Sequence, residues 1–491
     1  MKKYRTWSPE QSFLLPPSPM DWLPEGHLAY FLLDVVGELD LRAIEAAIHA
    51  KDARGERPYS PQMMTALLIY AYCTGVFSSR RIERATEEDV AFRVIAGGAH
   101  PHWTTINAFR LEHRDALAGL FTQVLTLCRR AGLKTAGHIA LDGTKIQANA
   151  SKHKAMSYER MKADEKRLAD EVEALMRRAK DADTRDDAEF GNLRGDELPA
   201  ELAHRNSRLE KIREAKKALE AEAAKSRAGQ LRENAAALRQ KLDDRTSTPK
   251  EKKTAATLAD KVEKAAARLD SGDDDDSDEG GGTSATELPK HRIQTTPAGT
   301  PKSNAQRNFT DPESRIMIRN GTFLQAFNAQ AAVSEDQIIV AHGVSNDPTD
   351  ARQLRPMVER ITASCGAPPD VLSADTGYLA EANIQFCAER GIDAYIATPK
   401  ADIVKLVAVP DTPALMTRWA MHQKVTSPRG RTVYAKRKIL VEPVFGQIKS
   451  AMGFRRFSLR GLRKSAAEWG FVCACHNLLK AFRAAPLATA T

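Results

Sequence analysis

The chain has 491 residues, 42% of them apolar, and a formal net charge of +9. This length exceeds what one small core holds, so two or three domains are expected. The positive charge favours a polyanionic partner without identifying one. No apolar run approaches the roughly 20 residues that cross a bilayer, which argues against a membrane protein.

The cysteines and the N-terminus predict the cellular setting. The six cysteines are scattered through apolar stretches of the sequence. The first residues lack the basic region and the unbroken apolar run of a signal peptide. We therefore expect a reduced, cytoplasmic protein.

Residues 14–132 are predicted to form a helical N-terminal domain. Pro61 stands where one helix begins and Gly75 where it ends. A following helix carries arginines at positions 80, 81 and 84. Short helices with such a face suit a helix-turn-helix DNA reader, and they suit equally a helical bundle with a solvated basic face.

A large insertion is predicted after the first strand of a second domain. The run HIALD at residues 138–142 is typical of a buried strand. Residues 153–270 are rich in Ala, Lys, Glu, Arg and Asp, with leucines recurring at threes, fours and sevens. Interrupted heptads favour an antiparallel helical hairpin or bundle over a long parallel coiled coil. Residues 271–310 then predict an acidic, glycine-rich flexible linker.

Strand patterns resume after the linker. Residues 321–333 and 337–344 predict a β-hairpin, residues 370–375 and 392–398 predict two more strands, and helices separate them. The order favours an α/β domain formed by residues 133–152 and 311–484, which the helical insertion interrupts.

Three carboxylates stand out in this domain. Asp142 and Asp375 each end an apolar strand, and Glu442 lies in the stretch VEPVFGQIK. Strand ends of open α/β sheets are where sites form. Three gathered carboxylates would repel unless cations lay between them, and oxygen ligands alone select Mg²⁺ or Mn²⁺. The alternative is that the aspartates cap turns and that Glu442 pairs with Lys438.

A basic segment follows Glu442 and could hold an anionic polymer. Residues 449–464 include six basic residues and no acidic one. Two metal ions about 4 Å apart can activate water or a 3′-hydroxyl for phosphodiester displacement, which requires DNA to be held nearby. We predict DNA contacts from Arg437, Lys438, Lys449, Arg455, Arg456, Arg460, Arg463 and Lys464.

Several motifs together resemble a known family. They are HIALDGTKIQANASKHK, DPESRIMIRNGTFLQAFNAQAAV, SNDPTDARQL, LSADTGYLAEANI and VEPVFGQIKSAMGFRRFSLRG. They closely resemble the DDE transposases of bacterial insertion sequences, nearest to the group numbered eleven-eighty-two. The stretch GERPYSPQMMTALLIYAYCTGVFSSRRIERATEEDVAFRVIAGG resembles the InsH-type N-terminal transposase domain.

The resemblance implies an RNase H-like catalytic domain in which Asp142, Asp375 and Glu442 bind two Mg²⁺ or Mn²⁺ ions. It also implies double-stranded DNA as the partner, both the terminal inverted repeats and the target, and a homodimer in the active complex at the nucleoid. Asn328 and Gln330 would support the site, although strand hydrogen bonding explains them equally well.

The family's signature is Tyr, two residues, Arg, three residues, Glu, six residues, Lys. Glu442 and Lys449 keep the last spacing, while Lys438 stands where the arginine is expected. Arg437 keeps the spacing from Tyr434 but not the spacing to Glu442. The roles of Tyr434 and of the arginine therefore stay open.

The sequence thus predicts a transposase that cuts the ends of its element and joins them to target DNA. Two rivals remain at this stage: a catalytically silent DNA-binding protein derived from a transposase, and an RNase H-like nuclease without strand transfer. None of the three carboxylates is missing, which speaks against the silent form.

Overall fold

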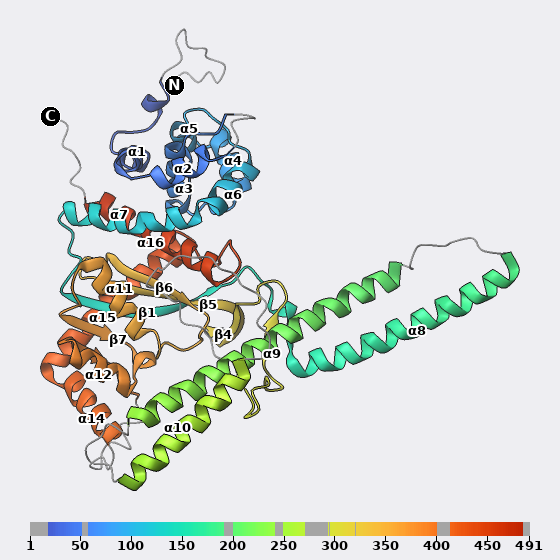
Figure 1. The fold of residues 1–491 in the computed structure, drawn as a ribbon. Helices are drawn as coiled ribbons and strands as arrows, with labels where there is room; N and C mark the ends of the chain where they lie inside the picture. Colours follow the sequence, from blue (N-terminus) through green and yellow to red (C-terminus); the bar gives the residue numbers. More distant parts are fainter. Residues whose placement is uncertain are drawn as a thin grey trace, which may run out of the picture.

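The structure is a computed structural model that describes residues 18–51, 57–190, 200–240, 249–270, 293, 295–319, 321–399 and 413–484. Figure 1 shows N-terminal helices stacked over a sheet, and long helices projecting from the other side of that sheet. The predicted mixed α/β class is confirmed. No helix in these ranges is long and apolar enough to cross a membrane.

The N-terminal helices pack around α3 (Pro61–Cys73), which is buried on nearly every side. Ser60 caps this helix with Pro61 at its first position, and Gly75 follows it with φ +81°. Both ends lie where the sequence predicts. The surrounding helices are α1 (Leu28–Glu38), α2 (Arg42–His49), α4 (Ser79–Glu88), α5 (Val90–Ile95), α6 (Trp103–Glu112) and α7 (Arg114–Arg130).

The sheet has β1 (His138–Gln147) at its centre. On one side β1 pairs antiparallel with β5 (Thr322–Val333), which pairs with β4 (Arg315–Arg319) and β6 (Ile339–Ser345). On the other side β1 is parallel to β7 (Val371–Ala374), which is parallel to β8 (Asp393–Ile396). The hairpin of β5 and β6 confirms the sequence prediction. β1 runs five residues beyond the predicted strand end.

Helices cover both faces of the sheet. Neighbouring residues of a strand point to opposite faces. A Cβ on Gly343 of β6 would collide with Arg360 of α11 (Leu354–Cys365), whereas His342 lies against Gly470 of α16 (Leu462–Ala484). Helices α11 and α16 therefore cover opposite faces. Within the described ranges this domain also contains α12 (Glu381–Glu389), α14 (Pro413–Thr426) and α15 (Pro428–Gly446).

Helix α15 contains Pro443, so the helix does not begin at this proline. Proline has no N–H to donate to the carbonyl four residues earlier, that of Ile439. The Gln337 side chain donates to that carbonyl instead, over 2.8 Å. Gln337 also accepts a hydrogen bond from Lys480 at 3.0 Å, so the turn between β5 and β6 joins α15 to α16.

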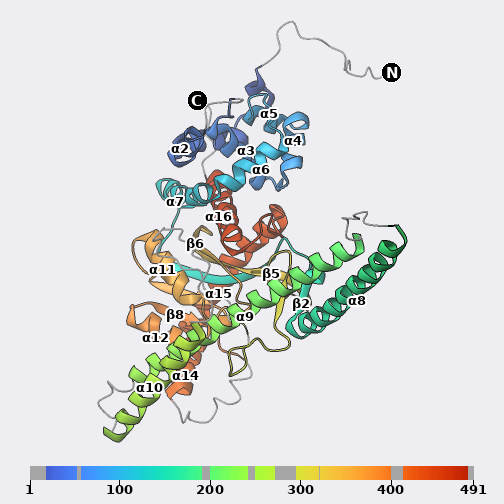
Figure 2. The same ribbon diagram turned by 45° about the vertical axis from the view of Figure 1, so that its right-hand side comes forward.

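Helix α16 is the buried axis that joins the N-terminal helices to the sheet. It packs beside α7, as Figure 2 shows, and its residues 467–479 are buried. Cys473, Cys475 and His476 are fully buried in it, which confirms that they belong to the core. Glu468 of this helix accepts hydrogen bonds from the Tyr72 hydroxyl at 2.9 Å and from the Ser458 N–H at 2.9 Å. One buried carboxylate thus links both parts of the molecule.

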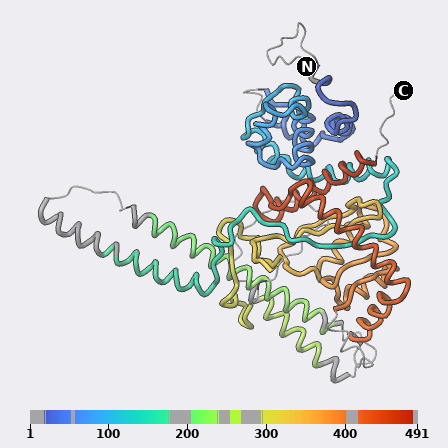
Figure 3. Tube along the Cα trace, turned by 180° about the vertical axis from the view of Figure 1, so that it is seen from behind, coloured from blue at the N-terminus to red at the C-terminus, as the bar shows by residue number. Residues whose placement is uncertain are grey.

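Long helices lie between β2 (Ala155–Ser157) and β3 (Gln306–Asn308), which pair antiparallel. They are α8 (Tyr158–Phe190), α9 (Ala200–Gln240) and α10 (Pro249–Asp270). Arg205 of α9 pairs with Glu171 of α8 and Arg213 pairs with Glu165, so these two helices run antiparallel. Arg239 of α9 pairs with Glu263 of α10. The pair formed by α8 and α9 and the pair formed by α9 and α10 project in different directions from the sheet, as Figures 1 and 3 show.

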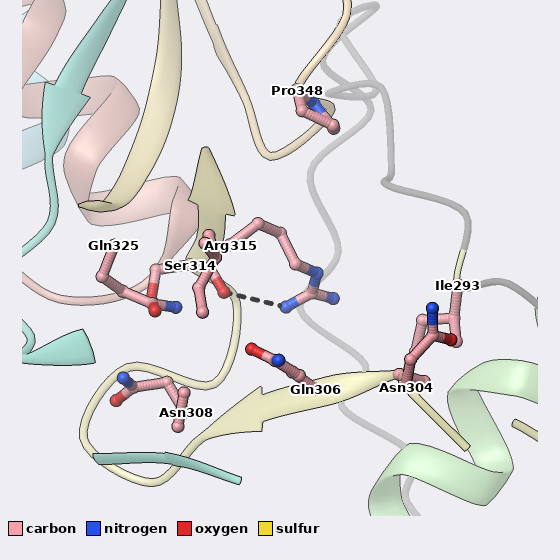
Figure 4. A pocket seen from close by; sticks show the side chains of 11 residues that line it. Ile293, Asn304, Gln306, Asn308, Ser314, Arg315, Gln325 and Pro348 are labelled. Carbon is pink, nitrogen blue, oxygen red and sulfur yellow. Dashed lines mark hydrogen bonds between the residues drawn. The ribbon is translucent and has the colours of Figure 1, made fainter. Parts of the chain in front are cut away.

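A pocket of about 270 Å³ lies where α9 meets the sheet, and Figure 4 shows its walls. Arg315 donates to the Ser314 carbonyl at 3.1 Å and pairs with Glu222 of α9. Arg307 of β3 pairs with the same glutamate at 3.0 Å. Arg315 therefore both lines this pocket and attaches the insertion through Glu222, whereas Glu222 and Arg307 lie outside the lining.

Replacing Glu468 by alanine should destabilise the whole protein. The change leaves two backbone N–H groups and the Tyr72 hydroxyl without their buried acceptor, at about 1–3 kcal/mol for each unsatisfied group. Urea denaturation should show a lower midpoint for Glu468→Ala and a smaller loss for Tyr72→Phe, which removes one hydrogen bond. An unchanged midpoint in Glu468→Ala would contradict this.

Candidate active site

Two of the predicted carboxylates meet at the centre of the sheet. Strands β1 and β7 are parallel, with Leu141 opposite Ala374. The residue that follows each of these is an aspartate: Asp142 on β1 and Asp375 just beyond β7. The register of one strand pair therefore brings together two residues that are 233 positions apart.

A single buried arginine lies between these carboxylates. Arg437 of α15 reaches Asp142 at 2.7 Å and Asp375 at 4.0 Å with the same nitrogen. Only 9% of Arg437 is exposed. The remaining oxygens accept backbone hydrogen bonds: Asp142 from the Gly143 N–H and Asp375 from the Gly377 N–H, both at 2.9 Å.

Partial burial raises the pKa of both aspartates, because it disfavours the charged carboxylate. It raises the pKa of Asp142 to about 6, against the opposing attraction of Arg437. Burial likewise raises the pKa of Asp375, and Arg437 again opposes the shift. The negative charge of Asp350 raises the pKa of both aspartates further, so the charge of Arg437 does not fully compensate the carboxylates at this site.

A second polar cluster lies beside the pair and is organised by Asp350. Its carboxylate accepts from Asn328 at 2.6 Å and from Gln330 at 2.7 Å, and Lys145 approaches it to 3.6 Å. Tyr378 donates to Gln330 from the opposite side. Asn328 and Gln330 thus bind Asp350 rather than the two predicted aspartates.

The cluster fits only because position 143 is a glycine. A Cβ on Gly143 would lie 2.3 Å from the Gln330 amide nitrogen and 2.6 Å from an Asp350 oxygen. Such distances exclude any larger residue unless the neighbours move. The glycine next to Asp142 is therefore the position that lets Asp350 approach β1.

Glu442 is not gathered with the aspartates. It is exposed on α15, and no hydrogen bond or ion pair joins its side chain to another described residue. Within the described ranges no group of three or more His, Cys, Asp and Glu side chains is placed to hold a metal ion. The structure thus assembles two members of the predicted triad and leaves the third outside.

Tyr434 lies in the same neighbourhood as Arg437. Burial raises the pKa of Tyr434, while the charge of Arg437 lowers it and those of Asp375 and Asp142 raise it. The pair that keeps the family's Tyr-to-Arg spacing therefore sits at the carboxylates. Lys438, the alternative, is exposed and outside this contact.

The basic segment runs alongside the continuation of β1. The Phe457 N–H donates to the Gln147 carbonyl at 2.8 Å, and the Gln147 N–H donates to the Arg455 carbonyl at 3.2 Å. Lys449, in a π-helical turn over residues 447–451, donates to the Thr144 hydroxyl on the same strand. The segment is thus tied to the strand that carries Asp142.

Most of the predicted DNA contacts are exposed on this segment. Asn149 accepts from Arg456 at 2.8 Å and from Arg460 at 3.2 Å, while Arg463 pairs with Asp115 of α7 at 3.2 Å. Arg437 alone among the predicted contacts is buried. The exposed ones are Lys438, Arg455, Arg456, Arg460, Arg463 and Lys464.

Sequence reasoning did not assign Asp350, Lys145 or Asn149. Asp350 stands in SNDPTDARQL and Lys145 three residues after Asp142, so both lay in stretches already singled out. Their roles depend on pairing between β1 and β5, which no local pattern reports.

Two family models match the chain. A Transposase DDE domain covers residues 295–478, and a Transposase domain (DUF772) covers residues 17–112. Both matches support a DDE transposase of insertion sequences. No curated protein and no solved structure matches it.

The DDE match bears on the fold and on the partner of this transposase. It implies an RNase H-like fold, and the two transposase domains imply DNA as the partner. Members of the family usually use divalent metal ions. The matched range includes Asp375 and Glu442 but begins after β1, so Asp142 enters the site through the pairing of β1 with β7.

The transposase variant Gly143→Ala should be less stable than the wild type. Its methyl group enters the space of Gln330 and Asp350, and such overpacking costs about 1–3 kcal/mol. Urea denaturation measures the loss. Gly119→Ala is the matched control, since nothing lies within 4 Å of a Cβ there. Equal stability of both variants would contradict the packing argument.

Proposed function

We propose that this transposase binds the terminal inverted repeats of its element, cleaves the DNA at the ends and transfers the 3′ ends to target DNA. The proposal is supported by one observation: Asp142 and Asp375 both pair with the buried guanidinium of Arg437, beside an exposed basic segment. Anionic substrate and cation-binding carboxylates are then adjacent.

The residues present fit divalent cations. Two partly buried carboxylates with raised pKa face the position that the positive charge of Arg437 occupies. Their oxygens are the hard ligands that Mg²⁺ and Mn²⁺ prefer. Asp142 and Asp375 would hold such ions, and Glu442, which lies outside the pair in this structure, would join them only after α15 brings it closer. Bound ions would activate the attacking hydroxyl or water and stabilise the leaving oxygen.

The chain's own side chains divide the remaining work. Arg437 neutralises the aspartates when no cation is bound, which keeps two buried negative charges compatible with the fold. Lys449 and the arginines of residues 455–463 bind the phosphates and orient the strand relative to Asp142. Two copies would hold both ends of the element together, as a homodimer.

Replacing Asp142 or Asp375 by asparagine, or Glu442 by glutamine, should abolish cleavage and leave DNA affinity within about threefold. The changes remove cation ligands but none of the exposed phosphate contacts. Cleavage of a labelled inverted-repeat end and its gel shift measure the two effects separately.

Glu359→Gln is the control, since Glu359 is an exposed carboxylate on α11. A variant that lost either aspartate and still cut at the wild-type rate would rule out the assignment. Joining of the labelled 3′ end to a target plasmid distinguishes a transposase from a nuclease that only cuts.

Mg²⁺ should raise the Tm at pH 7.5 and do so much less at pH 5. The folded pKa of Asp142, about 6, exceeds its usual 3.8, so without cation the unfolded chain ionises first and stability falls between about pH 4 and 6. Above pH 6 the ionised carboxylate binds the cation and stability returns. Differential scanning fluorimetry measures it, and an equal Mg²⁺ effect at both pH values would contradict the role of Asp142.

A further inference from the structure

A groove of about 380 Å³ beside the basic segment is not used by the proposed chemistry. It lies between the chain that follows β1, the short helix Lys152–Lys154 and β5. Its walls include Lys152, His153, Phe323 and Arg456. Its volume falls within the range of small-ligand sites, about 300–1,000 Å³.

Phe323 is an exposed aromatic ring at the rim of this groove. It is 57% exposed, and its cross-strand partner Ile318 is 60% exposed. Phe327 pairs with Ile146, so alternation along the strands puts Phe323 on the sheet face that carries Asp142. The Phe323 ring thus lies on the same face of the sheet as Asp142, and its exposure shows that it contributes little to the core.

Two basic residues line the groove together with this ring. Lys152 and Arg456 are exposed, and neither forms an ion pair with a carboxylate of a described residue. Asn149 holds Arg456 at 2.8 Å and donates to the Ser458 carbonyl at 2.7 Å, which orients the guanidinium. An aromatic face between two cations is the combination that binds a nucleotide.

We propose that this groove is a nucleotide subsite that holds an unpaired base of the DNA strand. The base stacks on Phe323, and its phosphates lie between Lys152 and Arg456. A ring can stack only on a base whose face is exposed, so the occupant is an unpaired nucleotide rather than an intact duplex. The inference rests on the proposed function, because it assumes DNA on this face of the sheet.

The test compares two single-stranded oligonucleotides of equal length, one of thymidine and one of abasic residues. Their binding to the full chain is measured by fluorescence anisotropy in EDTA, which prevents cleavage. Phe323→Ala should weaken binding of the thymidine strand about tenfold and leave the abasic strand unchanged. Phe323→Trp should restore binding.

Ile318→Ala is the matched control, because it removes an equally exposed apolar side chain from the paired position. It should change neither affinity. Arg456→Gln should weaken both strands alike and lower the slope of log affinity against log salt by about one. Equal weakening of both strands by Phe323→Ala, or no weakening, would overturn the proposal.

The outcome is separable from that of the proposed function. Binding in EDTA does not depend on catalysis, so Asp142→Asn should give the same base-dependent effect of Phe323. If Phe323→Ala had no base-dependent effect on binding while the wild-type protein still cleaved DNA, the subsite alone would be rejected. Cleavage that survives loss of Asp142 would reject the proposed catalytic assignment and leave the subsite standing.

Discussion

The site is organised around the electrostatic repulsion between two carboxylates, those of Asp142 and Asp375, which the sheet brings together. Parallel pairing of β1 with β7 brings Asp142 and Asp375 side by side, and partial burial removes part of the hydration that would stabilise their charges. Unpaired buried charge is costly enough that such groups neutralise or find a counter-ion. Arg437 supplies that charge from α15. The same oxygens would bind divalent cations, so the guanidinium and the cations compete for one position. Under the proposed function, cation binding would therefore have to displace Arg437 or share the carboxylate oxygens with it.

Helix α15 explains why two carboxylates and not three are gathered. Arg437 and Glu442 are five positions apart, which is about 140° around an α-helix at 3.6 residues per turn. The family's signature spaces arginine and glutamate by four positions, which would leave them about 40° apart. The additional residue in this chain turns Glu442 away when Arg437 faces the sheet. Pro443 and the π-helical turn over residues 447–451 follow at once, and both interrupt regular helical bonding. Glu442, the third proposed ligand, thus lies next to the least regular part of α15.

The sequence predicted what local patterns encode. The aspartates ending apolar runs, the β5 and β6 hairpin and the helices of residues 153–270 all follow from periodicity and turn residues. It did not predict that Arg437 is buried against Asp142, or that Asn328 binds Asp350, because those contacts are set by strand register and helix phase. The leucine repeats likewise predicted helices without showing that α9 pairs with both α8 and α10. Local patterns specify elements, and long-range pairing specifies sites.

The basic segment is placed relative to the carboxylates by rigid contacts. Gln147 of β1 pairs with it, Glu468 of α16 accepts two of its N–H groups, and Glu313 accepts the Leu462 N–H at 2.8 Å. Gln147 lies five residues beyond Asp142, about 16 Å along a strand that rises about 3.3 Å per residue. DNA advances 3.4 Å per base pair along each strand, so about five base pairs span that distance. For DNA whose axis runs along β1, phosphates bound at Arg456 would lie about half a helical turn from the scissile bond at Asp142. Because Glu468 also accepts a hydrogen bond from Tyr72, the N-terminal helices would share in setting that offset.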